Sequence, residues 1–199
     1  MWARIFAFLY DPFLAAAERR GLARQRRRLV AGLEGDVLEI GAGTGLNVAH
    51  YGPRARVTYT EPDPHMAARL RRRGAEVVEA AAESLPFPEA TFDTVVSTLV
   101  LCTVPDVPAA LAEVARVLKP GGRLVFIEHV RAEPGTPLQR WQDRLHGPWK
   151  AFACGCHCNR DLLASLAAAG YDAHDVERYA WRFMPPIVRP VVVGSATPV

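Results

Sequence analysis

Short apolar runs alternate with segments of helical periodicity along most of the chain. The runs end in glycine, proline or acidic residues, and they are apolar throughout, as are strands buried on both faces of a parallel sheet. Between the runs, apolar residues recur every three or four positions, which is typical of helices with one buried face. This alternation predicts a doubly wound α/β fold. We expect strands at residues 37–40, 56–60, 76–79, 92–97, 124–127, near 173–182 and at 188–196.

Helices are expected to fill the intervals between most of these strands. The last two strands have no long helix between them, so they should pair antiparallel at the sheet edge. Together these elements predict a Rossmann-like, seven-stranded, mostly parallel sheet with helices on both faces and an antiparallel edge strand. The helices are expected within 1–35, from near Thr44, from Pro64 to about Arg73, after Asp106, and twice within 134–169 with a break at 153–159.

A glycine-rich turn follows the first expected strand. Gly41, Gly43 and Gly45 let the backbone approach a ligand closely, because no Cβ intervenes. The helix expected from Thr44 would turn its free N–H groups toward the same ligand. The spacing differs from the dinucleotide fingerprint Gly-x-Gly-x-x-Gly. Glu39, just before the turn, would repel a pyrophosphate, but it suits a cationic ligand such as an amino group.

Polar side chains also follow the other expected strands. Because the carboxyl ends of parallel strands meet at one edge of the sheet, we expect these residues to share a surface. Glu61 follows the second strand, about twenty residues after the glycines, where an acid can accept hydrogen bonds from ribose hydroxyls. The later strand ends carry Ala82-Glu83-Ser84, Leu99-Val100-Leu101 and Glu128-His129.

Five motifs occur in order over residues 36–130. They are Val37-Leu38-Glu39-Ile40-Gly41-Ala42-Gly43-Thr44-Gly45, Glu61-Pro62, Leu85-Pro86-Phe87, Phe92-Asp93 and Leu118-Lys119-Pro120-Gly121-Gly122. As an ordered set they are specific, and they resemble the class I S-adenosylmethionine-dependent methyltransferases. Over nearly the whole chain, a narrower resemblance is to the small branch related to mammalian thiol S-methyltransferases. It is carried by Thr98-Leu99-Val100-Leu101-Cys102, Glu128-His129-Val130 and Gly155-Cys156-His157-x-Asn159-Arg160-Asp161.

The resemblance implies S-adenosyl-L-methionine as cofactor. The glycine turn would pass under its methionine part, with Glu39 near the amino group and Glu61 at the ribose. Leu99 would lie near the transferring end. The expected cofactor-binding set is Glu39, Gly41, Gly43, Thr44, Gly45, Asn47, Glu61, Pro62, Met66, Ala82, Glu83 and Leu99.

Adenine recognition is the point at which the chain departs from its relatives. Quinone-methylating relatives often carry an aspartate that bonds the adenine amino group, and Ala81 stands in that place here. Ala82 and Glu83 would border the adenine, either through backbone groups or through the Glu83 carboxylate. Met66 would pack near the adenine, or it would lie in the core.

We expect methyl transfer to a small, lipophilic acceptor, with a thiol as the first choice. A thiol has a pKa near 8.5 in water, so a neighbouring histidine would assist it. His129 is the expected base or orienting group, and the alternative is a histidine packed against Trp141 or Trp149. A quinone ring carbon and a phospholipid amine remain open as acceptors. A non-catalytic cofactor-binding module and a nucleic-acid-binding module are the alternatives outside enzymes.

Cys154, Cys156 and Cys158 alternate in one short segment. Their spacing does not match the Cys-x-x-Cys pair of a zinc site, and we expect no metal there. Lining of the acceptor pocket is the preferred interpretation, with a soft ligand such as trivalent arsenic as the alternative. The sequence carries no recognisable export signal, so we expect reduced thiols and a cytoplasmic location.

Charge and apolar residues gather at the N-terminus. The net charge of +3 is too small to indicate nucleic acid, and we expect no such partner. Six arginines lie within residues 19–28, after an apolar and aromatic run at 1–17. No run reaches the roughly 18–20 apolar residues of a membrane span. We therefore expect a lid over the cofactor cleft, with peripheral membrane contact through residues 1–28 as the alternative.

These interpretations divide a single methyltransferase domain, residues 1–199, into three parts. Residues 1–35 form the N-terminal helical lid or surface segment, and 36–130 form the cofactor-binding core. Residues 131–199 supply the acceptor-side helices and the last two strands. The chain is long enough for one core of this kind, and the sequence leaves its oligomeric state open.

Overall fold

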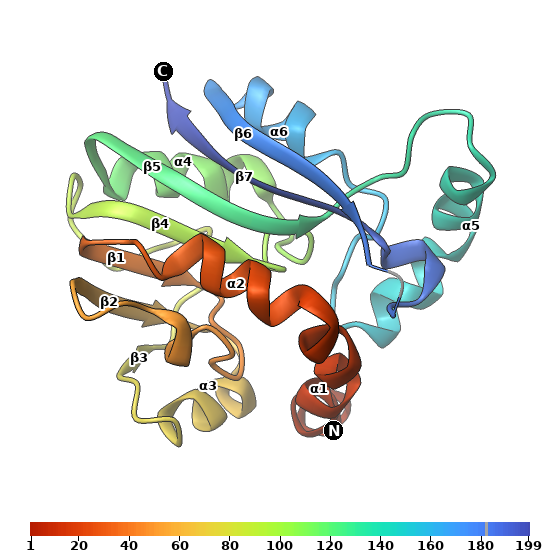
Figure 1. Cartoon of the computed structure of the whole chain (residues 1–199), viewed down its shortest axis with the longest axis horizontal. Coiled ribbons are helices and arrows are strands. Elements are labelled where there is room, and N and C mark those ends of the chain that lie inside the picture. The colour runs from red at the N-terminus through yellow and green to blue at the C-terminus, as the bar shows by residue number, and fades with distance from the viewer. Residues whose placement is uncertain (182) are drawn as a thin grey trace.

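One seven-stranded sheet forms the centre of the molecule (Figure 1). The computed structural model describes residues 1–181 and 183–199. The strands are β1 (Gly35–Ile40), β2 (Ala55–Thr60), β3 (Val77–Val78), β4 (Phe92–Thr98), β5 (Leu118–His129), β6 (Tyr171–Ala180) and β7 (Pro190–Pro198). They lie in the order β3-β2-β1-β4-β5-β7-β6. The pairs from β3 to β5 are parallel, whereas β7 runs antiparallel to both β5 and β6.

The predicted fold class is therefore confirmed, including the antiparallel pairing of the last two strands. β6 is the outermost strand, and β7 lies between it and β5. β5 starts earlier than expected, because Leu118 already pairs with Phe92 before an irregularity in the register leads to the Thr94–Arg123 pair. The strand expected near 173–182 ends at Ala180, and residue 182 lies outside the described residues.

Helices cover both faces of the sheet. The α-helices are α1 (Trp2–Ala17), α2 (Ala23–Val30), α3 (Pro64–Arg71), α4 (Val107–Val117), α5 (Pro137–Phe152) and α6 (Leu162–Ala168), and the shorter helical segments are η1 (Glu18–Leu22), η2 (Val48–His50) and η3 (Pro186–Val188). Leu38 on β1 packs in one core cluster with residues of α4 and α6, whereas its neighbour Val37 packs in another with Val30 of α2. The side chains of a strand alternate between faces, so both sides of the central strand are buried.

The sharp helix starts follow from local side-chain capping. Asp63, Asp106 and Asp161 each accept hydrogen bonds from backbone N–H groups in the first turn of α3, α4 and α6. Thr136 does the same for α5. Such caps satisfy N–H groups that have no partner inside the helix. The helix predicted after Asp106 is thus confirmed, with Asp106 as its N-terminal cap.

The helix predicted from near Thr44 is wrong. The chain makes irregular turns after the glycines and then only the 3₁₀ segment η2. Gly45 has a φ of +84°, outside the helical range. The side chain of Asn47 is bound on several sides, donating to Glu39 and Thr98. Pro53 follows closely and disfavours helical backbone at the residue before it. The short segment η2 therefore cannot extend into a longer helix.

Candidate active site

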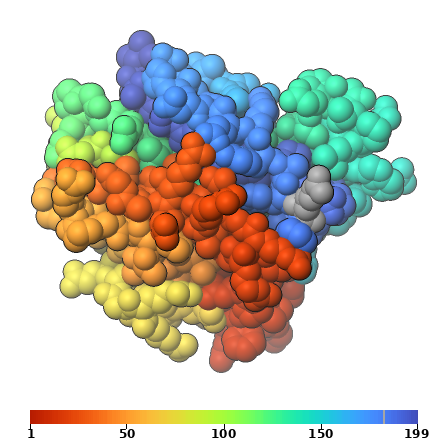
Figure 2. Space-filling model, viewed as in Figure 1, coloured from red at the N-terminus to blue at the C-terminus, as the bar shows by residue number. Residues whose placement is uncertain are grey.

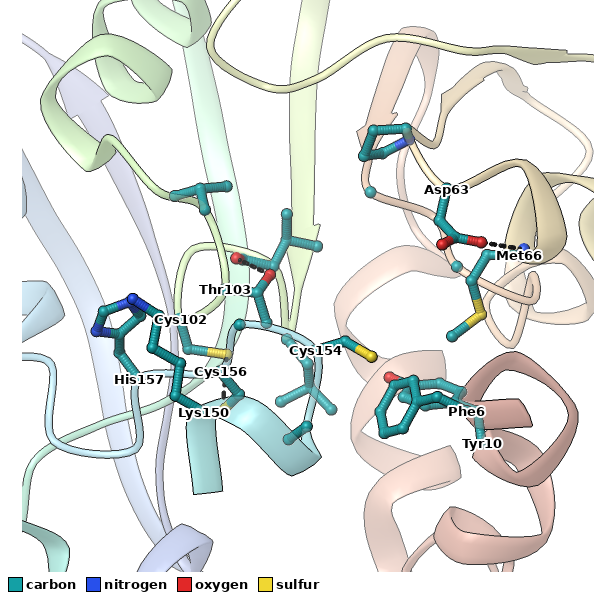
Figure 3. Close-up of a pocket in the computed structure, with 18 of the residues that line it drawn as sticks. Phe6, Tyr10, Asp63, Met66, Cys102, Thr103, Lys150, Cys154, Cys156 and His157 are labelled. Atoms are coloured by element: carbon teal, nitrogen blue, oxygen red, sulfur yellow. Dashed lines mark hydrogen bonds between the residues drawn. The ribbon is translucent and has the colours of Figure 1, made fainter. Parts of the chain in front are cut away.

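A cavity of about 710 Å³ opens beyond the carboxyl ends of the central strands. It is bounded by the glycine turn, the start of α3, the loop after β4, the end of α5 with the loop that follows, and α1 (Figure 3). This is the position at which doubly wound sheets bind ligands, because the strand order reverses here between β1 and β4. The predicted site residues that line it are Gly41, Gly43, Glu61, Pro62, Met66, Ala82, Glu83, Leu99 and His129.

Glu61 projects from the end of β2 beside the glycine turn. Its carboxylate accepts hydrogen bonds from the backbone N–H of Gly43 at 2.8 Å and of Asp63 at 2.9 Å. Burial raises its pKa, while these two backbone donors act in the opposite direction. Each carboxylate oxygen retains a further lone pair, so Glu61 can hold two additional donors at the cavity wall.

The two glycines of the turn that line the cavity, Gly41 and Gly43, differ in what surrounds them. Both have positive φ, +53° at Gly41 and +59° at Gly43. A Cβ on Gly41 would lie 2.7 Å from the nearest methyl carbon of Val100. A Cβ on Gly43 would meet nothing closer than the Gly41 carbonyl oxygen at 3.9 Å, so it would stand in open space. A side chain at position 41 would thus clash with Val100, whereas the space beside Gly43 is open to a ligand.

The remaining predicted residues, Glu39, Thr44, Gly45 and Asn47, do not line the cavity. Glu39 is buried behind the glycine turn and accepts hydrogen bonds from Asn47 at 2.9 Å and from the Tyr51 hydroxyl at 2.6 Å. Burial raises its pKa to about 7, against the effect of these two donors and of Arg26. A cation close to Glu39 would favour the charged carboxylate.

A second buried carboxylate shapes the loop after β4. Glu128 accepts four hydrogen bonds: one from the Ser97 hydroxyl, and three from the backbone N–H groups of Val100, Leu101 and Cys102. Leu99, at the start of the loop, has a φ of +61°, which is costly for a residue with a Cβ. Glu128 therefore holds a strained loop whose residues line the cavity.

His129 follows Glu128 and also faces the cavity. Burial lowers its pKa to about 4, although the backbone of Val188 acts to raise it. The ring is thus neutral near pH 7. Nδ1 is buried and has no hydrogen-bond partner among the described residues. The ring stacks edge-on against Trp181, and not against Trp141 or Trp149 as the alternative prediction had it.

The N-terminal helix α1 covers one side of the cavity. Phe6, Tyr10, Phe13 and Leu14 line the wall, and Figure 3 places Phe6 and Tyr10 near Met66. Figure 2 shows the N-terminal helices, in red and orange, lying on the surface of the molecule. Among the described residues, no helix is both long enough and apolar enough to span a bilayer.

Asp11 fastens this helix to the rest of the site. It accepts hydrogen bonds from the Thr44 hydroxyl and from Arg69 and Arg73 on or just beyond α3. Burial alone would raise the pKa of Asp11, but Thr44 and Arg69 hold it below its usual range. The contact joins α1 to the glycine turn and to α3. An acid within the otherwise apolar run at 1–17 is the feature of the sequence that could have identified this contact.

Comparison with known proteins defines the family. A family model described as a methyltransferase domain matches residues 38–126. Human thiol S-methyltransferase TMT1A is 33% identical over 96% of this chain and 82% of its own length. A phosphatidylethanolamine N-methyltransferase of Cereibacter sphaeroides is 34% identical over 67% of each chain. A solved structure of a SAM-dependent methyltransferase from Thermotoga maritima, described as a possible histamine N-methyltransferase, superposes over 100% of both chains with a TM-score of 0.73 and 25% identity.

The chain therefore belongs to the S-adenosylmethionine-dependent methyltransferases, and its cofactor is S-adenosyl-L-methionine. Within that family it is similar to the thiol S-methyltransferases, as its motifs indicated. The residues present fit the cofactor. Gly43 leaves an open cradle, and Glu61 retains acceptor capacity beside it.

Proposed function

We propose that the enzyme methylates the sulfur of a small, lipophilic thiol. The observation that carries this proposal is that His129, a neutral ring whose buried Nδ1 has no hydrogen-bond partner among the described residues, lines a cavity with aromatic and apolar walls. Such a cavity suits an acceptor that is largely apolar and carries one polar reacting atom. The similarity to thiol S-methyltransferases over most of the chain supports the same acceptor class.

On the cofactor side, we assign the ribose hydroxyls to Glu61 and the methionine part to Gly41 and Gly43. Glu39 acts from behind the turn as the buried negative charge that favours the cofactor's amino group. When bound, the cofactor supplies a methyl group on a sulfonium, which is already a good leaving group. In this assignment, residues 36–130 bind the cofactor, residues 131–199 complete the acceptor side, and residues 1–35 form the lid within one domain.

His129 is the proposed acceptor-side residue. With a pKa of about 4, it is neutral throughout the neutral range and can accept a hydrogen bond from a thiol S–H. It is too weak a base to hold the proton at equilibrium, because a free thiol has a pKa near 8.5. Its role is therefore to orient the sulfur and to receive the proton in passing as the S–H bond weakens.

His129→Ala is expected to lower kcat for a thiol about 100-fold, the lower end of the range for a general acid–base group. Cofactor affinity, measured by calorimetry with S-adenosylhomocysteine, should stay within about threefold because the acceptor side alone is altered. His174→Ala is the matched control, since His174 is exposed on β6. In the unaltered enzyme, activity should rise with pH toward about 8.5 as the acceptor ionises, with no step from His129 near neutrality.

A panel of acceptors separates this proposal from its alternatives. It contains an alkyl thiol, an aryl thiol, a quinone precursor and phosphatidylethanolamine, each with labelled cofactor. The proposal is supported if the enzyme methylates the thiols and the His129→Ala variant does so at a lower rate. Transfer to phosphatidylethanolamine or to the quinone precursor, with none to thiols, would contradict it. The phospholipid amine is included because a phosphatidylethanolamine N-methyltransferase is among the relatives.

We also propose that the outer face of α1 rests on an anionic lipid surface. Its inner face lines the cavity, while Ile5, Phe8 and Leu9 are exposed on the outside. Arg4 lies on the same helix, and further exposed arginines follow in η1 and α2, a combination of charge and apolar surface that anionic headgroups attract. The exposed arginines are Arg4, Arg19, Arg20, Arg24, Arg27 and Arg28. A lipophilic acceptor could then pass from the lipid to the cavity beneath the helix.

Vesicle co-sedimentation tests this contact. The enzyme should bind vesicles of phosphatidylcholine with phosphatidylserine more tightly than phosphatidylcholine alone, and salt should weaken the binding. Phe8→Glu should reduce binding at least about tenfold, because it puts a charge in place of an exposed aromatic ring that would insert into the lipid. Val78→Glu, at an exposed apolar position on β3, is the control. Equal sedimentation of the two variants would show that α1 makes no such contact.

A further inference from the structure

Two cysteines from distant parts of the chain meet in the wall of the cavity. Cys102 lies in the loop after β4 and Cys156 in the loop after α5, and their Sγ atoms are 3.8 Å apart. Their exposed fractions are only 1% and 5%, but both line the cavity. In Figure 3 they lie on the wall opposite Met66 and Asp63. The pair therefore faces the cavity on the side away from the proposed adenine and ribose positions.

The two loops are fixed to each other by backbone contacts. The N–H of His157 donates to the Cys102 carbonyl at 2.7 Å, so the residues carrying the thiols lie side by side. Arg160 reaches across and donates to the carbonyl oxygens of Leu101 and Val104. Glu128 holds the Cys102 backbone from the other side. The proximity of the two sulfurs is thus built into the packing of both loops.

The two thiols differ in acidity. The Cys102 thiol, together with Trp149, lowers the pKa of Cys156 despite its burial, and the positive charge of Arg160 acts in the same direction. The pKa of Cys102 is raised by the interaction with Cys156 and by burial. Cys156 is therefore the better thiolate, and Cys102 is the thiol beside it. This is the arrangement of an attacking and a resolving cysteine.

We propose that Cys156 and Cys102 reduce a small organic disulfide bound in the cavity by thiol–disulfide exchange. The choice of a disulfide of the acceptor thiol rests on the proposed function. Such an exchange would generate the thiol acceptor in the same cavity in which it is methylated. The proposed methyl transfer assigns no role to either cysteine, so the exchange would be a second activity.

The exchange balances in two steps. The Cys156 thiolate attacks one sulfur of the disulfide, whose S–S bond breaks, and the first thiol leaves with one proton. Cys102 then attacks Cys156 Sγ, which forms the Cys102–Cys156 disulfide and releases the second thiol with the other proton. The small disulfide gains two electrons and the protein loses two. A low-molecular-weight dithiol then reduces the pair and completes the cycle.

Closing the protein disulfide requires a modest movement. An S–S bond is about 2.05 Å long, so the sulfurs must approach by roughly 1.8 Å. The loop of Cys156 includes Cys154 and Gly155, which have φ angles of +46° and +106°. Among the described residues, no group of three His, Cys, Asp or Glu side chains is placed to hold a metal ion, and the two thiols belong to no such group.

The test uses 4,4′-dithiodipyridine, which releases a coloured thiopyridone at each step. Because Cys154 is exposed and would react separately, the parent protein carries Cys154→Ser. It should rapidly release about two equivalents of thiopyridone, and its intact mass should fall by two hydrogens with no adduct retained. Peptide mapping should find Cys102 linked to Cys156. These measurements need no variant at either cysteine, and a dithiol reductant should reverse the change.

Single variants separate the two roles. In the Cys154→Ser parent, Cys102→Ser should release about one equivalent and keep a mixed disulfide on Cys156, whereas Cys156→Ser should lose the rapid phase. Cys158→Ala should behave like the parent, because Cys158 packs in another core cluster. A parent that reacts only after denaturation, or a stable adduct in the parent, would overturn the proposal. No methyl donor is present, so this result is independent of whether thiols prove to be the methyl acceptors.

Discussion

Replacing Glu128 with alanine is expected to lower the free energy of unfolding by about 3–5 kcal/mol, the combined cost of unpaired buried donors and a cavity. The carboxylate is fully buried and is the shared acceptor of one hydroxyl and three consecutive backbone N–H groups. Alanine would leave these four donors unpaired and open a space beside them. The loop would also lose the contacts that keep Leu99 at positive φ. Denaturant unfolding monitored by tryptophan fluorescence measures the loss.

A glutamine at the same position separates the charge from the shape. Its Oε1 can replace one carboxylate oxygen, but its amide N–H₂ would face a donor, so Glu128→Gln should cost about 1–3 kcal/mol. Glu133→Ala is the control because Glu133 is exposed, and a surface change of this kind should stay within about 0.5 kcal/mol. If Glu128→Ala unfolded with the same free energy as Glu133→Ala, the loop would not depend on this carboxylate.

The sheet could be predicted because its strands are short, apolar and bounded by turn residues. β1 and β4 lie at the centre of the sheet, where burial on both faces leaves little choice of side chain. The strand ends then placed Glu61, Leu99 and His129 on one cavity without knowledge of their side-chain contacts. The connectivity of a parallel sheet, rather than any single motif, made this part of the site predictable.

The segment after the glycine turn, where the predicted helix does not form, could not be predicted from its local sequence. Local sequence allowed a helix from Thr44, but Asn47 instead turns inward to Glu39, Thr98 and Arg26. These partners come from three other elements, so their effect on the backbone cannot be read from the segment itself. This wall of the cavity is consequently formed by an irregular turn, in which Glu61 accepts the Gly43 N–H, and not by the end of a helix.

The contacts that hold α1 at the cavity and the thiol pair could not be predicted, for a related reason. α1 reaches the cavity because Asp11 binds residues of the glycine turn and α3. Cys102 and Cys156 meet only because two loops dock on each other. Each contact joins segments that are remote in sequence and lie outside the regular hydrogen-bonding of the sheet. The segment with Cys154, Cys156 and Cys158 was expected to line the cavity; Cys154 and Cys156 do so and Cys158 does not, and nothing in the sequence indicated Cys102 as a neighbour.

Glu61→Ala is expected to weaken cofactor binding by about 10²–10⁴-fold. In the proposed assignment, the carboxylate accepts hydrogen bonds from two ribose hydroxyls. Each hydrogen bond to a charged group contributes about 1.5–3 kcal/mol to the free energy of binding. The substitution also frees the N–H groups of Gly43 and Asp63, so the turn beneath the cofactor loses its anchor. Calorimetric titration with S-adenosylhomocysteine measures the change. Glu79→Ala, at an exposed ion pair with Arg71, should bind as the unaltered chain does.

Glu61→Gln distinguishes ribose binding from support of the turn. Glutamine can still accept through one oxygen, so it should retain the bond to one backbone N–H but lose an acceptor for the other and for one ribose hydroxyl. Binding should fall about 10–100-fold, between the unaltered chain and Glu61→Ala. Ligand-free thermal unfolding provides the second readout, because a role confined to the turn would lower the melting temperature without this graded loss of affinity. Unchanged affinity in both variants would remove Glu61 from the cofactor site, and the ribose would then have to be held from elsewhere on the cavity wall.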